Sequence, residues 1–158
     1  VGLLIYFFPS LYGDSYHGLK EVVTEPLTIP YISLLFLLSI AVLKPLASSL
    51  TLGAGGDGGV FAPSIVAGAF LGLVVAFVGN YYFDADLIPI NFALVGAAAT
   101  LSASLFAPFT SLVLICNLLP NGYVLFIPIL LGSFIAYFFS KKLLPYNVYS
   151  YDFYVASK

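Results

Sequence analysis

The sequence predicts an all-α, polytopic membrane protein in which some helices are short and broken. Of its 158 residues, 61% are hydrophobic and only 8% are charged, whereas a soluble domain carries roughly 25% charged residues. Several apolar segments approach the roughly 20 residues that a helix needs to cross a bilayer. Others are shorter and are separated by Gly and Pro, which is typical of helices that end inside a membrane protein.

The N-terminal part predicts the end of one helix and a polar connection. An apolar run over residues 1–8 ends at Pro9, and residues 18–30 hold charged side chains and two prolines. The sequence starts inside an apolar run and lacks the basic region of a signal peptide. We therefore expect a fragment, with residues 1–158 forming one partial transmembrane domain.

Two long apolar stretches follow, at 31–52 and 60–79, with a glycine-rich run between them. Lys44-Pro45 interrupts the first stretch. A charge at that depth indicates a functional residue by default. A helix break at Pro45 would instead let the long Lys44 side chain reach the interface, and this is the outcome we expect.

Three further apolar pieces, at 91–105, 107–119 and 123–139, come after a polar connection. The pieces are separated only by the breaks Phe106-Ala107-Pro108 and Pro120-Asn121-Gly122. Backbone left unpaired at such depth must be buried or line a polar cavity. Small residues four apart, as in Gly68 and Gly72, predict close packing of helices. We expect that packing to lie within one bundle rather than between subunits.

The composition excludes several functions. A net charge of −2 and the absence of arginine leave no basic surface for nucleic acid. One histidine, His17, and one cysteine, Cys116, cannot build a metal site of several such ligands, and no catalytic constellation supports an enzyme. We expect no metal and no cofactor. Three of the five lysines lie in the tyrosine-rich tail after residue 140, which favours a cytoplasmic C-terminus.

The most informative segment runs from Gly58 and Gly59 through Val60 and Phe61 to Pro63. It is a glycine-rich turn that leads into an apolar helix. The first N–H groups of a helix lack intrahelical partners and carry partial positive charge, and proline fits the first turn. The sequence therefore predicts a site where main-chain amides hold a small anion, weakly enough for conduction.

The alternative is a flexible loop in which Asp57 caps the same helix. Aspartate is a favoured N-cap residue, and its carboxylate would accept hydrogen bonds from the amides that an anion needs. The spacing of the residues leaves both interpretations open.

Gly58-Gly59-Val60-Phe61-Ala62-Pro63 resembles the G-x-F-x-P signature of the CLC family of voltage-gated chloride channels and chloride–proton antiporters. The stretch from Asn91 to Thr110, with Ala107-Pro108 near its end, is similar to a second family motif. The resemblance extends from Val1 to about Tyr151 and implies the second inverted-repeat half of a CLC-type pore domain. It also implies a multi-pass protein that transports chloride, and a homodimer with contacts at 107–119 and 123–139.

The resemblance further implies that the amides of Val60 and Phe61 face a chloride ion. A tyrosine hydroxyl after the last long helix is the family's other contact from this half. Asn147-Val148-Tyr149-Ser150 is similar to that pattern, which assigns Tyr149 and leaves Tyr146 as the alternative. A tyrosine in this tail could equally be an interfacial aromatic residue.

The chain also departs from the family pattern. It has Phe106 where the family often has arginine, and Cys116 or Asn117 where it often has glutamate. The motifs that supply the serine contact and the gating glutamate belong to the first half, so a channel and an antiporter that also moves protons both remain open. The alternative function is a non-transporting membrane scaffold or a truncated subunit.

Overall fold

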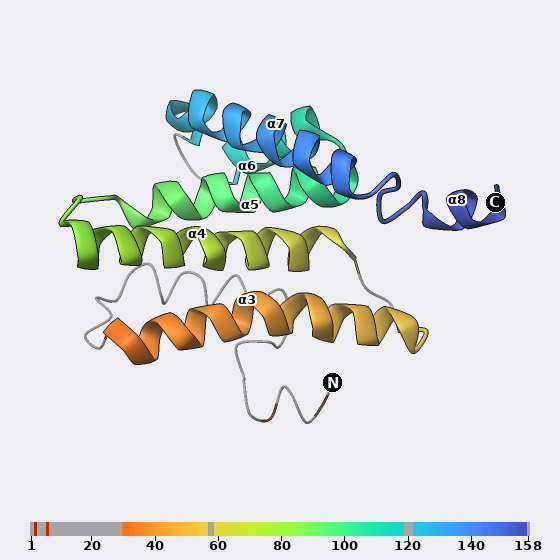
Figure 1. Ribbon diagram of the computed structural model, residues 1–158, viewed down its shortest axis with the longest axis horizontal. Coiled ribbons are helices and arrows are strands. Elements are labelled where there is room, and N and C mark those ends of the chain that lie inside the picture. Colours follow the sequence, from red (N-terminus) through yellow and green to blue (C-terminus); the bar gives the residue numbers. More distant parts are fainter. Residues whose placement is uncertain (1, 3–5, 7–29, 57–58, 119–121, 158) are drawn as a thin grey trace.

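The computed structural model describes residues 2, 6, 30–56, 59–118 and 122–157, and every regular element in these residues is a helix (Figure 1). The elements are α3 (Pro30–Gly53), α4 (Phe61–Phe83), α5 (Pro89–Leu105), α6 (Pro108–Cys116), the 3-10 helix η2 (Gly122–Leu125), α7 (Phe126–Leu143) and α8 (Tyr151–Ala156). The predicted all-α class is confirmed. The expectations for His17, Asp57 and Gly58 lie outside the described residues.

The long helices lie side by side (Figure 1). α4 packs between α3 and α5, and α5 also contacts α6 and α7. The core between these helices is apolar, with fully buried side chains such as Leu37, Phe70, Leu101, Ile115 and Ile129. α8 projects beyond the bundle at the end where α5 and α7 finish.

Three helical segments in the described part of the chain are long and apolar enough to cross a membrane, namely Leu34–Gly53, Phe61–Phe83 and Gly122–Leu143. α5 has 17 residues, which corresponds to about 25 Å of helix and falls short of a hydrocarbon core of about 30 Å. α6 is shorter still, with 9 residues. The predicted mixture of spanning and short helices is confirmed.

The break predicted at Lys44-Pro45 is wrong, because α3 continues through Pro45 without interruption. Proline removes one backbone hydrogen bond, a loss that neighbouring helices in a membrane bundle can compensate. Lys44 lies in the helix interior and is only 6% exposed. The expectation that its side chain reaches the interface depended on the break and is also wrong.

α3 ends in a Schellman motif formed by part of the glycine-rich run. Gly55 has a φ of +80°, a left-handed conformation that favours glycine. Its N–H donates to Leu52 O at 3.0 Å, and the N–H of Gly56 donates to Thr51 O at 2.9 Å. The first glycines of the run therefore terminate α3 rather than belong to a flexible loop.

α4 and α5 approach closely because glycines face each other across the contact. A Cβ on Gly68 would strike Gly96 O, a Cβ on Gly72 would strike Phe92 O, and a Cβ on Gly96 would strike Gly68 O. The prediction that Gly68 and Gly72 mediate packing within the bundle is confirmed. Their absence of side chains sets the distance between the two helices that hold the candidate site.

The short connection from α5 to α6 turns at Phe106, whose φ is +58°. Its N–H donates to Ser102 O at 2.9 Å, and α6 then starts with Pro108 at its first position. Behind this turn Ser102 Oγ donates to Ser133 O at 2.7 Å, and Ser111 Oγ lies 3.2 Å from Ser133 Oγ. These three buried serines join α5, α6 and α7 where α5 has ended.

Candidate functional site

The first amides of α4 have no hydrogen-bond acceptor inside the helix. Val60 is the N-cap residue, with φ −81° and ψ −23°, and no side chain of a described residue caps this end. Both the N–H and the Oγ of Ser64 donate to Val60 O, at 3.2 and 2.8 Å. The backbone bond from Ser64 to Val60 is the first hydrogen bond of the helix. The N–H groups of Val60, Phe61 and Ala62 precede it and have no i−4 acceptor inside the helix.

The predicted anion-site residues lie in order along this turn. Gly59 is exposed, Val60 is partly buried, Phe61 is 37% exposed and Pro63 is buried. The residues at the start of α4 are therefore partly exposed, and the helix enters the bundle at Pro63. Gly58 and the competing cap Asp57 lie outside the described residues, so the choice between cap and anion site stays a prediction.

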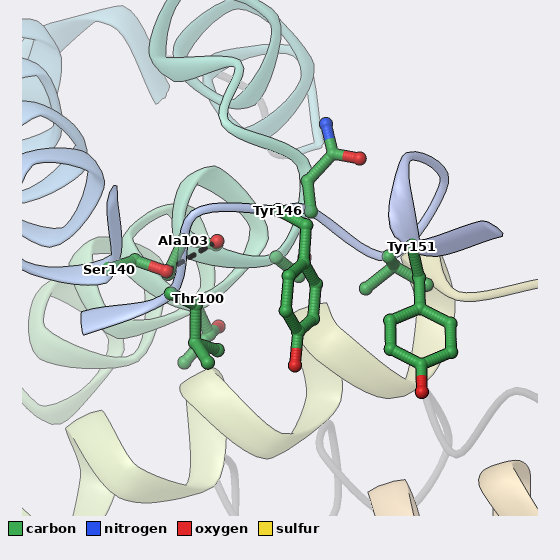
Figure 2. Close-up of a pocket in the computed structure, with 9 residues that line it drawn as sticks. Thr100, Ala103, Ser140, Tyr146 and Tyr151 are labelled. Carbon is green, nitrogen blue, oxygen red and sulfur yellow. Dashed lines mark hydrogen bonds between the residues drawn. The ribbon is translucent and has the colours of Figure 1, made fainter. Parts of the chain in front are cut away.

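A cavity of about 550 Å³ lies beside this end of the bundle (Figure 2). It forms where the last turns of α5 and α7 meet the segment that follows α7. Its lining residues are Thr100, Ala103, Ser104, Ser140, Leu144, Tyr146, Asn147, Val148 and Tyr151. None of these side chains carries a formal charge, and its polar groups are hydroxyls and one carboxamide. The side-chain donors of four lining residues are bonded to backbone carbonyls, namely those of Thr100, Ser104, Ser140 and Asn147.

Thr100 connects the cavity to the first turn of α4. Its Oγ1 donates to Ser64 O at 2.7 Å and also lies 3.0 Å from Gly96 O in its own helix. Ser64 is the residue whose amide closes the turn on Val60. Two hydrogen bonds, from Thr100 to Ser64 and from Ser64 to Val60, thus connect the wall of the cavity to the residue at which α4 begins.

The last carbonyls of α5 anchor the C-terminal segment. Ser140 Oγ of α7 donates to Ala103 O at 2.9 Å, and the N–H of Val148 donates to Ser104 O at 3.3 Å. The Nδ2 of Asn147 donates to Leu105 O at 3.0 Å. α5 therefore contacts both sides of the site: it bonds to the start of α4 through Thr100, to α7 through Ser140, and to the segment after α7 through Asn147 and Val148.

The two candidate tyrosines have different surroundings. Tyr146 lines the cavity and packs against the rings of Tyr151 and Tyr154, with centroid distances of 5.1 and 5.0 Å. Figure 2 shows the rings of Tyr146 and Tyr151 pointing to the side of the cavity where α4 runs. Tyr149 is 59% exposed and is not among the lining residues. The sequence-based assignment of Tyr149 stays a prediction.

Thr100, Ser140 and Asn147 were not predicted as site residues. Thr100 stands in a stretch of small residues that indicates packing, and its hydroxyl is unremarkable in the sequence. For Asn147 the sequence did contain an indication, because an asparagine followed three residues later by a serine is typical of a capped turn. In the structure the N–H of Asn147 donates to Ser150 Oγ at 2.9 Å. No group of three or more metal-ligating side chains occurs among the described residues.

Spanning apolar helices beside shorter ones, with an uncharged cavity at one end, define an integral membrane protein. The profile of the family described as "Voltage gated chloride channel" matches residues 1–141. The chain belongs to this family. No solved structure matches the chain at a significant level.

Curated relatives agree with the family. The chain is 31% identical over 150 residues to the voltage-gated ClC-type chloride channel ClcB of Escherichia coli O139:H28 (strain E24377A / ETEC), and equally to ClcB of Escherichia coli (strain K12 / DH10B). The match covers 94% of this chain and 34% of each relative. The chain thus spans about a third of the length of the curated relatives it matches.

Proposed function

We propose that this chain forms part of a chloride pathway, in which the first amides of α4 hold the anion. The main support for this proposal comes from the start of α4. Val60 and Phe61 precede the first helical hydrogen bond there, and no described side chain caps them. Partial charges of helix amides attract an anion without binding it as tightly as a lysine or arginine would. Family membership supports chloride as the ion.

A tyrosine hydroxyl completes the proposed contact from this part of the protein. Tyr146 lines the cavity next to Thr100, whereas Tyr149 is largely exposed. The proposed ligand is Tyr149, which the family resemblance selects, and Tyr146 is the alternative. A neutral phenol donor suits a weakly held anion.

The first experiment measures chloride flux from liposomes that contain the full-length parent protein, with and without a pH gradient. Chloride efflux that drives proton movement would identify an antiporter, and chloride flux without proton movement would identify a channel. The absence of chloride flux would contradict the proposal and favour a membrane scaffold.

A second experiment separates the two tyrosines. Tyr146→Phe and Tyr149→Phe each remove one hydroxyl and keep the ring, and chloride binding to each full-length variant is measured by calorimetry. We expect Tyr149→Phe to weaken binding about tenfold, as the loss of one hydrogen bond would, and Tyr146→Phe to leave it unchanged. The opposite result would assign the role to Tyr146.

The proposed assembly is a homodimer through α6 and α7, as the family resemblance implies. The outer faces of these helices expose Phe109, Val113, Leu131, Ile135 and Phe138, whose exposed fractions lie between 54 and 65%. Such a continuous apolar face is compatible with lipid as well as with a second copy. Light scattering of the purified full-length protein distinguishes a dimer from a monomer.

A further inference from the structure

We propose that the C-terminal end of α7 binds the phosphate group of an anionic phospholipid through Lys141 and Lys142. The ligand is a component of the bilayer and not the transported ion, so this inference is independent of the chloride pathway. The lysines supply the charge, Tyr137 holds one of them in place, and exposed apolar side chains of α7 offer a surface to the acyl chains.

The two lysines stand where a spanning helix reaches the lipid headgroups. The apolar segment Gly122–Leu143 has 22 residues, which corresponds to about 33 Å of helix and is enough to cross a hydrocarbon core of about 30 Å. Lys141 and Lys142 lie in its last turn, and both side chains are exposed. Basic side chains at the end of a spanning helix lie at the level of the lipid phosphates.

Tyr137 holds the ammonium group of Lys141 in a defined position. Lys141 Nζ donates to Tyr137 Oη at 3.0 Å and lies 5.4 Å from the centroid of the same ring. The Tyr137 ring is held in turn by edge contacts with Phe106 and Phe138, at centroid distances of 6.0 and 5.3 Å. An ammonium group has three N–H donors, so one bond to Tyr137 leaves two for phosphate oxygens. Because Lys141 is already oriented, it loses less side-chain entropy when phosphate binds.

No carboxylate neutralises the two lysines within the described part of the chain. The acidic side chains that the structure describes, Asp84 and Asp86, belong to the connection between α4 and α5. This connection lies at the opposite end of the bundle from the last turn of α7 (Figure 1). A phospholipid phosphate carries the negative charge that the α7 end lacks, and lysine binds phosphate as a point charge.

Exposed apolar side chains beside the lysines favour a lipid over a free phosphate ion. Phe139 is 66% exposed and Leu143 is 78% exposed. Phe139 precedes Lys142 by three residues and Leu143 by four, so these side chains are neighbours on the helix surface. Acyl chains from a phosphate at Lys142 would run along Phe139 toward the middle of the bilayer. The charged and the apolar parts of a phospholipid thus both meet matching parts of α7, whereas a free phosphate ion matches only the lysines.

The experiment measures phospholipid binding to the purified full-length protein by native mass spectrometry. Dioleoyl phosphatidylglycerol is the anionic probe. Dioleoyl phosphatidylcholine, which has the same acyl chains and no net charge, is the reference lipid. The double variant Lys141→Gln/Lys142→Gln removes both charges and keeps side chains that are polar and unbranched. The single variants Lys141→Gln and Lys142→Gln serve if the double variant does not fold.

We expect the double variant to bind phosphatidylglycerol about 30-fold more weakly than wild type, and each single variant about fivefold more weakly. Binding of phosphatidylcholine should not change. Tyr137→Phe keeps both charges and the ring but removes the acceptor of Lys141. It should weaken phosphatidylglycerol binding about threefold, because Lys141 is then no longer oriented in advance. An unchanged affinity in Tyr137→Phe would overturn the role of Tyr137.

The matched control is Asp84→Asn/Asp86→Asn, at the opposite end of the bundle. It changes the net charge by as much as the double lysine variant does, with the opposite sign. Asparagine tolerates the positive φ of these positions, which is +44° at Asp84 and +46° at Asp86. We expect the control to leave the affinity for phosphatidylglycerol unchanged.

An unchanged affinity for phosphatidylglycerol in the lysine variants would overturn the proposal. A rise in the aspartate control as large as the fall in the lysine variants would also overturn it, because net charge rather than a site would then set the affinity. Displacement of phosphatidylglycerol by an equal concentration of soluble glycerol phosphate would identify a free anion as the ligand instead of a lipid. None of these results depends on whether the protein transports chloride.

Discussion

The hydroxyl of Thr100 on α5 donates a hydrogen bond of 2.7 Å to the carbonyl of Ser64 in the first turn of α4. Ser64 in turn donates from its N–H to Val60 O. The residue at which α4 begins is thus connected in two steps to the wall of a cavity built by α5, α7 and the segment after α7. A side chain in a stretch of small residues therefore links the two parts of the candidate site.

Removal of this hydroxyl tests the link. Thr100→Val keeps the shape of the side chain and deletes the donor to Ser64 O. We expect a loss of about 1 kcal/mol in the free energy of unfolding, together with weaker chloride binding to the full-length protein. Thermal unfolding and calorimetry measure the two effects. Thr110→Val, at an exposed position on α6, is the matched control, and equal effects at both positions would disprove the link.

The close contact of α4 and α5 predicts a strong effect for Gly96→Ala. The added Cβ would strike Gly68 O and approach Gly72 N, and neither backbone atom can move without moving α4. We expect a destabilisation of about 1–3 kcal/mol, as for other overpacked contacts. Gly53→Ala is the control because nothing lies within 4 Å of the added Cβ. A melting temperature of Gly96→Ala that equals that of wild type would contradict the packing.

Gly55→Ala isolates a backbone effect. Open space surrounds the position of the added Cβ, but the φ of +80° is one that an alanine adopts only with strain. We expect the free energy of unfolding to fall by about 1 kcal/mol, and denaturation of the purified protein measures it. Gly53→Ala, two residues earlier and inside α3, should be neutral or slightly stabilising because alanine favours helix.

The buried serines at the junction of α5, α6 and α7 should contribute modestly. Ser102→Ala removes the hydroxyl that donates to Ser133 O, so this carbonyl loses one hydrogen bond. Hydrogen bonds between membrane helices average about 0.6 kcal/mol, and we expect a loss of that order in unfolding experiments. Ser49→Ala is the control, since Ser49 is exposed and bonds only within its own helix, to Leu46 O. If Ser102→Ala lowered the free energy of unfolding by more than a typical cavity in a protein core does, Ser102 would have a role beyond packing.

Much of the helical organisation could be predicted because it depends on apolar length and on Gly and Pro at the boundaries. The short α5 and α6 and the long α4 and α7 follow from this pattern, to within a few residues at their ends. Pro45 could not be judged in the same way. A proline ends a helix in water, but inside a packed membrane bundle the cost of one missing hydrogen bond is offset by tertiary contacts.

The amide end of α4 could be predicted from its local sequence, whereas the cavity could not. Gly59-Val60-Phe61 is contiguous, so a local pattern suffices to locate the start of the helix. The cavity joins Thr100, Ser140 and Asn147, which lie far apart in the sequence and meet only because α5 and α7 end together. The choice between Tyr146 and Tyr149 depends on the turn at Asn147, whose geometry no periodicity encodes.

The last carbonyls of α5 have an electrostatic consequence. α4 and α5 run in opposite directions, so the positive end of one helix dipole lies at the same end of the bundle as the negative end of the other (Figure 1). The carbonyl of Ala103 accepts a hydrogen bond from Ser140 of α7, and those of Ser104 and Leu105 accept hydrogen bonds from the segment after α7. These donors offset the negative pole. If the proposed anion binds at this end, the field that it meets is the difference between two opposed helix dipoles, and better coverage of the α5 carbonyls would strengthen its binding.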